Sequence, residues 1–202
     1  MNEAPLEELS VEGRSRKHAE QAEARRRPDR RRKNLLIVNT GDGKGKTTAA
    51  LGLLLRAWGQ GLPVAMYQFI KAKTGNWGEI KAARKMGLSI VPLGDGFTWE
   101  SRDIAHDRAL ATEGWALCRE AILSGAYDVV VLDELTYCFR FAWLDLAEVL
   151  EVLRRRPGNV HVVITGRGAP PELIELADLV TEMRVVKHPY GDGVKAQKGI
   201  EF

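Results

Sequence analysis

An α/β fold with a mostly parallel sheet and helices on both faces is predicted by three features of this 202-residue sequence. Short, uniformly apolar runs alternate with stretches of helical periodicity, and such runs are typical of parallel strands buried on both faces. One of them, residues 35–38, leads directly into a glycine-rich loop, and another, residues 129–132, ends in an acidic pair. Alternating strands and helices join through right-handed crossovers into one sheet.

The glycine-rich loop, residues 40–48 (TGDGKGKTT), has the composition of a phosphate-binding loop. Its glycines let the backbone turn tightly, so that amide groups and the start of the next helix can face phosphate oxygens. Thr40 departs from the usual pattern, which begins with glycine, and the alternative is a glycine-rich turn without a ligand. We expect phosphate binding by Gly41, Asp42, Gly43, Lys44, Gly45, Lys46, Thr47 and Thr48.

The acidic pair, Asp133 and Glu134, follows the apolar strand expected over residues 127–134. In P-loop nucleotidases such a strand ends beside the phosphate loop, where a carboxylate and the Thr47 hydroxyl hold Mg2+. A helix cap is the alternative for an isolated acidic pair, and the upstream loop favours the metal site. The predicted fold is therefore a P-loop NTPase of the RecA-like kind.

The other elements follow from apolar periodicity and from helix start and stop signals. Further strands are expected at residues 35–39, 63–70, 88–91, 160–164 and 179–185. Helices are expected at residues 46–58, 103–124, 145–155 and 171–177, with a short one ending at Met86. The tail, residues 191–202, is expected to be an ordered loop at most.

Two loop features have more than one interpretation. Phe97 and Trp99 stand in a loop without strand or helix periodicity, where they form either a binding surface or a plug for the edge of the core. Arg167 follows the strand expected at residues 160–164 and either reaches the nucleotide or is an ordinary surface arginine.

The leader, residues 1–33, is polar and holds the excess positive charge, with ten Lys or Arg against seven Asp or Glu. We expect a solvated, partly helical leader or a lid over a small ligand; a nucleic-acid arm is less favoured because residues 34–202 carry no net charge. The P-loop domain is expected over residues 34–202.

The compartment is indicated by the cysteines and by the absence of a targeting signal. Cys118 and Cys138 are isolated, so no disulfide framework is expected, and no signal peptide or membrane span is apparent. A cytoplasmic protein is expected.

The motifs together resemble the P-loop ATP:corrinoid adenosyltransferases, which act on cob(I)yrinic acid a,c-diamide or cob(I)alamin. The matching segments run from about residue 34 to the C-terminus and are residues 40–50, 68–71, 96–100, 130–137, 164–168, 177–178, 186–188 and 193–200. Asp42 stands where family members often have Asn. An ATPase or kinase is the alternative, although no arginine-rich lid follows the loop, and a GTPase is disfavoured because no Asn-Lys-x-Asp motif is present.

The resemblance implies transfer of the 5′-deoxyadenosyl group of ATP to Co(I) of a corrinoid, with release of tripolyphosphate. It implies charge stabilisation by Lys44 and Lys46, Mg2+ (or Mn2+) held by Thr47, Glu134 and Asp133, and Arg167 at the ATP. Phe97 and Trp99 would pack against the corrin, and the leader would fold over it. A homodimer and an electron-donor flavoprotein are further implied, while membrane or nucleic-acid partners are not.

Overall fold

The computed structural model describes residues 11, 15, 16, 18–20, 23, 33–72, 74–96 and 104–201. The chain divides into two units, residues 1–33 and residues 34–202. In the first unit, the described residues up to Glu23 are helical. Within the described part of the chain, no helix combines the length and the apolar character needed to span a bilayer.

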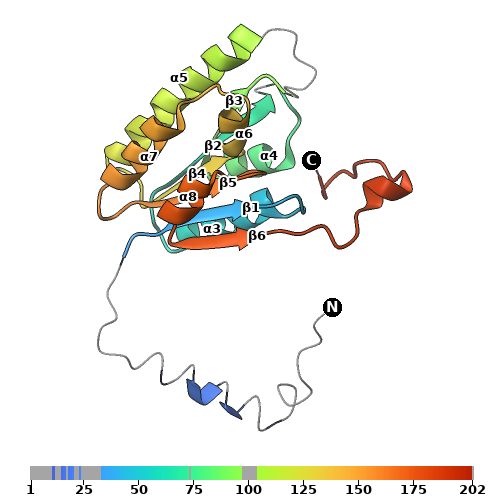
Figure 1. The fold of residues 1–202 in the computed structure, drawn as a ribbon. Helices are drawn as coiled ribbons and strands as arrows, with labels where there is room; N and C mark the ends of the chain where they lie inside the picture. The colour runs from blue at the N-terminus through green and yellow to red at the C-terminus, as the bar shows by residue number, and fades with distance from the viewer. Residues whose placement is uncertain are drawn as a thin grey trace. The chain divides into compact units, whose positions relative to one another are not determined.

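The second unit is built on one six-stranded sheet in which every pairing is parallel (Figure 1). The strand order is β3-β2-β4-β5-β1-β6. The strands are β1 Leu36–Thr40, β2 Val64–Ala72, β3 Ser89–Gly94, β4 Val129–Asp133, β5 His161–Thr165 and β6 Leu179–Glu182. The predicted α/β class and the alternation of strands and helices are confirmed.

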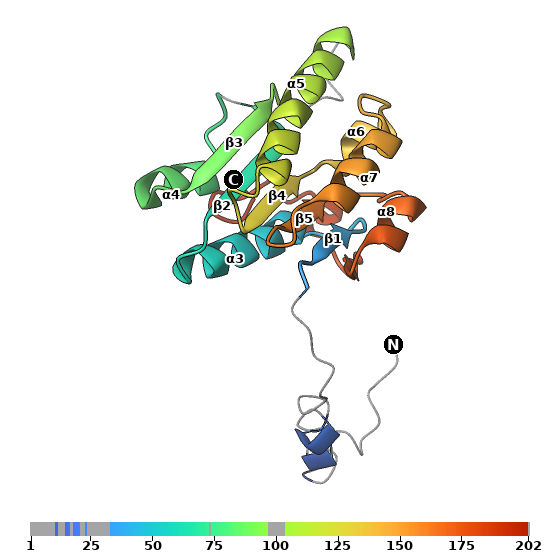
Figure 2. The same ribbon diagram turned by 90° about the vertical axis from the view of Figure 1, so that its left-hand side faces the viewer.

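Helices cover both faces of this sheet, as Figures 1 and 2 show. On one face, α3 (Lys46–Gly59) packs its buried residues with alternate strand residues such as Ile37 and Met66. On the other face, α5 (Ile104–Leu123), α7 (Leu146–Arg155) and α8 (Pro171–Leu176) pack against the strand residues that point to that side, such as Val38 and Val130. Successive strand residues point to opposite faces, so strands this apolar need cover on both sides.

Several boundaries differ from the expected ones. The edge strand β6 ends at Glu182 instead of residue 185, because its only neighbour, β1, ends at Thr40, which is paired with Glu182. Two short elements were not expected: the helix α6 (Thr136–Arg140) and the 3-10 turn η2 (Pro189–Asp192). Neither is long enough to show a helical period in the sequence. The remaining helix, α4 (Gly78–Met86), lies where the short helix was expected.

Candidate nucleotide site

The phosphate loop follows β1 and turns into α3, whose first residue is Lys46. Gly41 and Gly45 have φ angles of 90° and 110°, a region that favours glycine. A Cβ on Gly41 would lie 2.5 Å from the Met183 carbonyl oxygen, and one on Gly43 only 2.8 Å from that of Arg184. The glycines are therefore required both for the turn and for close contact with the chain after β6.

One part of the expected loop geometry is different. We expected successive loop amides to face a phosphate, but the Gly43 N–H donates to the Met183 carbonyl oxygen at 2.7 Å. The reason is the parallel strand β6 beside β1, whose continuation offers acceptors to the loop. The amide of Gly43 thus helps to fix the loop to the sheet.

The Lys46 ammonium lies inside the loop. It donates to the carbonyl oxygens of Gly41 at 2.7 Å and Gly43 at 2.6 Å. Burial, followed by the nearby positive charge of Arg167, lowers the pKa of Lys46 from its ordinary value. The side chain is thus a partly desolvated cation at the start of a helix.

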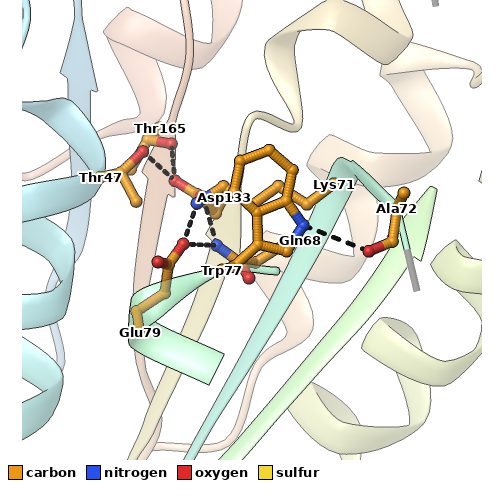
Figure 3. Close-up of polar contacts among 8 residues, drawn as sticks. All are labelled: Thr47, Gln68, Lys71, Ala72, Trp77, Glu79, Asp133 and Thr165. Carbon is orange, nitrogen blue, oxygen red and sulfur yellow. Dashed lines mark hydrogen bonds and ion pairs between the residues drawn. The ribbon is translucent and has the colours of Figure 1, made fainter. Parts of the chain in front are cut away.

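Asp133 lies at the end of β4 and is completely buried. Its Oδ1 accepts from the Thr47 hydroxyl at 2.9 Å and from the Thr165 hydroxyl at 2.6 Å, while Oδ2 accepts from Gln68 Nε2 at 3.1 Å (Figure 3). A buried carboxylate needs such donors, since an unpaired one would cost several kcal/mol. Asp133 is therefore bound by protein groups on both oxygens, and it orients the Thr47 hydroxyl.

Glu134 follows directly and has the unusual φ of 63°, which turns the chain away from the strand. Its amide donates to the Thr165 hydroxyl oxygen at 2.9 Å. Burial, and then the charge of Asp133, raises the pKa of Glu134 from 4.5 to about 7. Three cations oppose this rise, and Lys71 does so more than Lys46 or Arg167.

A cavity of about 500 Å³ opens at this edge of the sheet. Of the residues expected at the site, it is lined by Gly43, Lys44, Gly45, Lys46, Thr47, Thr48, Glu134 and Arg167. The lining does not include Gly41, Asp42 or Asp133. Gly41 forms the turn of the loop, Asp42 is exposed, and Asp133 lies behind Thr47. Phe97 and Trp99 lie outside the described residues.

The cavity is also lined by residues that were not assigned to the site from the sequence, although several of them lie in the segments 68–71, 130–137 and 193–200 that carry the family resemblance. Lys71, Glu79, Tyr137 and the segment 199–201 line it, and Lys44 forms an ion pair with Glu201 at 2.9 Å. Thr165 and Lys71 lie at or near strand ends at the same edge as the acidic pair, which is the signal that could have found them. Gln68 lies in the middle of β2, where it is paired with Asp133. Residues 199–201 belong to no strand, and only the family resemblance of the segment 193–200 pointed to this part of the chain.

Comparison with known proteins identifies the family. Residues 32–202 match the family described as ATP:corrinoid adenosyltransferase BtuR/CobO/CobP. The chain belongs to this family. The resemblance found in the sequence motifs is thereby confirmed.

Curated members of the family are similar over most of their length. A corrinoid adenosyltransferase of Pseudomonas aeruginosa is 39% identical over 204 residues, which cover 100% of both chains. Corrinoid adenosyltransferase CobA of Salmonella typhimurium is 41% identical over 191 residues, or 94% of this chain and 96% of the relative. The corrinoid adenosyltransferase of Escherichia coli K12 is 42% identical over 172 residues, or 84% and 86%.

Among solved structures, the flagellar accessory protein FlaH of Methanocaldococcus jannaschii is similar in fold. It superposes with a TM-score of 0.52 and 10% identity, covering 74% of this chain and 70% of that one. At this identity the likeness concerns the fold alone.

Proposed function

We propose that this protein transfers the 5′-deoxyadenosyl group of ATP to the Co(I) of a reduced corrinoid, with release of tripolyphosphate, in adenosylcobalamin biosynthesis and corrinoid salvage. Family membership over residues 32–202 is the observation that carries this proposal. The cavity supports it, because Lys46, Thr47 and Glu134 line one space beside a helix start. Cobalamin, cobinamide and cobyrinic acid a,c-diamide are the corrinoid substrates considered.

In the proposed reaction, the electron pair of Co(I) attacks C5′ of the ribose and forms a cobalt–carbon bond. The bond between C5′ and its oxygen breaks, and its electron pair leaves with the triphosphate. Because reduced cobalt is itself a strong nucleophile, the protein needs no activated serine or cysteine. Its tasks are to position the two substrates and to stabilise the charge on the departing triphosphate.

The charge stabilisation is assigned to the loop and to nearby cations. Lys46 lines the cavity from within the loop, and Lys44 and Arg167 line it as well. We assign Lys44, Lys46 and Arg167 to the triphosphate because an ammonium or guanidinium forms strong, charge-assisted hydrogen bonds with phosphate.

The residues present fit a magnesium ion. Mg2+ prefers oxygen ligands and keeps water and substrate phosphates in its shell, so it needs few protein ligands. The Thr47 hydroxyl and the Glu134 carboxylate line the cavity and would hold it, whereas among the described residues no group of three or more His, Cys, Asp or Glu forms an all-protein cage. Asp133 would act through Thr47, since both its oxygens already accept protein hydrogen bonds. When bound, Mg2+ (or Mn2+) would neutralise charge on the leaving phosphates.

Further parts of the proposal rest on the family. Phe97 and Trp99 would pack against the corrin face and exclude an axial cobalt ligand, which makes reduction to Co(I) easier. The leader, residues 1–33, would fold over the corrinoid, and its removal should then raise the KM for the corrinoid.

We also propose that the protein is a cytoplasmic homodimer, and light scattering would measure its oligomeric state. We propose further that a flavoprotein reduces the corrinoid, which reconstitution with a purified donor would test.

An anaerobic assay with ATP, Mg2+ and pre-reduced cobalamin tests the proposed reaction. The expected products are a light-sensitive adenosylcorrinoid and intact tripolyphosphate in equal amounts. Lys46→Ala should abolish turnover, whereas Lys85→Ala, an exposed site on α4, should not change it. Release of ADP or orthophosphate in place of tripolyphosphate would instead support an ATPase or kinase.

A further inference from the structure

Lys71 is near the end of β2, the strand that lies between β3 and β4 in the sheet. Its side chain is 16% exposed, and it lines the same cavity as Lys46, Thr47 and Glu134. The sheet order places Lys71 on the β3 side of Glu134, whereas the phosphate loop follows β1 on the other side. The cavity therefore has a cation on each side of Glu134.

Three features hold the Lys71 ammonium in place (Figure 3). It forms an ion pair with Glu79 in the first turn of α4, and it lies 4.9 Å from the centroid of the Trp77 ring. The Trp77 indole N–H donates to the Ala72 carbonyl oxygen at 3.2 Å. A Cβ on Gly75 would lie 2.0 Å from Trp77 Nε1, so the loop is shaped closely around this ring.

Glu79 and Lys71 are connected to the phosphate loop through Gln68, a residue that is only 1% exposed. Gln68 Nε2 donates to Glu79 at 3.4 Å and to Asp133 at 3.1 Å, and Asp133 accepts from Thr47. The Gln68 amide thus separates two carboxylates, which fixes the orientation of its nitrogen. The cluster is built on two buried strands, and holding a lysine in one rotamer within it costs side-chain entropy.

We propose that Lys71 is a further phosphate-binding residue. When ATP binds, its ammonium leaves the Glu79 carboxylate and binds an oxygen of the triphosphate. This inference rests on the proposed function only in taking the cavity as the ATP site. An ammonium has three donor hydrogens and binds phosphate as a point charge, and a cation fixed in advance at a partly dry site acts at little reorganisation cost. Glu79 keeps the cation in place in the free protein and competes with phosphate for it.

Binding of inorganic tripolyphosphate and of ATP, measured by calorimetry with Mg2+, tests this exchange. Lys71→Met keeps the aliphatic stem and removes the charge, so both ligands should bind about ten- to a hundredfold more weakly. Glu79→Gln removes the competing anion, so both should bind as well as to the wild type or more tightly. Lys81→Met, at an exposed site on α4, is the matched control and should bind like the wild type.

A merely structural ion pair gives a different pattern, because either substitution breaks the same contact. Equal losses of binding in Lys71→Met and Glu79→Gln, or unchanged binding in Lys71→Met, would overturn the proposal. Thermal unfolding shows whether each variant is folded. If Lys71→Met is not folded, tenfold weaker binding of the ligands by Glu79→Gln is by itself enough to overturn the proposal. If the wild type does not bind tripolyphosphate, both this proposal and the assignment of the cavity as the ATP site are overturned. If the wild type binds tripolyphosphate but does not adenosylate a corrinoid, only the proposed reaction is overturned.

Discussion

Glu134→Gln is expected to stabilise the ligand-free protein in a pH-dependent way. Burial and the neighbouring Asp133 raise the pKa of Glu134 from 4.5 to about 7. A carboxyl whose folded pKa is raised favours the fold fully below its unfolded pKa and loses that stability as the pH rises through the folded value. The difference between about 7 and 4.5 corresponds to about 3 kcal/mol at about 1.4 kcal/mol per pH unit. Gln has a similar shape and does not ionise, so it avoids this cost.

Urea unfolding without Mg2+ or nucleotide, between pH 5.5 and pH 8.5, measures the effect. The free energy of unfolding of Glu134→Gln minus that of the wild type should grow by about 2 kcal/mol over this range, because about 1 kcal/mol of the cost is already present at pH 5.5. Glu175→Gln, at an exposed position of α8, is the control and should show no such trend. A difference that stays constant with pH would refute the raised pKa of Glu134.

Two further predictions concern the loop and the corrinoid site. In Gly43→Ala the new Cβ would lie 2.8 Å from the backbone of Met183, so we expect a loss of about 1–3 kcal/mol in urea unfolding together with weaker ATP binding. Gly52→Ala in α3 meets nothing within 4 Å and should be neutral or stabilising by up to about 1 kcal/mol, and a similar loss there would contradict the steric explanation. Replacing Phe97 and Trp99 by Ala should reduce turnover from Co(II) at least about tenfold more than turnover from pre-reduced Co(I); equal losses would remove their proposed role.

Much of the fold and the centre of the site could be predicted because their signals are local. A buried parallel strand is an apolar run, a helix has its period, and the loop with Lys46 and Thr47 shows its chemistry in nine consecutive residues. Asp133 and Glu134 were assigned to the same edge because the carboxyl ends of parallel strands meet there. The family resemblance came from such short motifs, which can be recognised without any knowledge of how the chain packs.

The different tasks of the acidic neighbours were decided by the tertiary structure. Thr47 and Asp133 are 86 residues apart in sequence, and Thr165 and Gln68 come from two other strands. No local pattern indicates that these three side chains occupy both oxygens of Asp133 and leave Glu134 beside the cavity.

By itself, the sequence determined the order of the strands and of the longer helices, the position of the glycine-rich loop and the family. Only the tertiary structure decided which side chains from distant segments share the cavity, among them Lys71, Glu79 and Glu201. The physical reason is that backbone conformation follows from neighbours along the chain, whereas burial, ion pairing and a shifted pKa depend on whatever the folded sheet brings together.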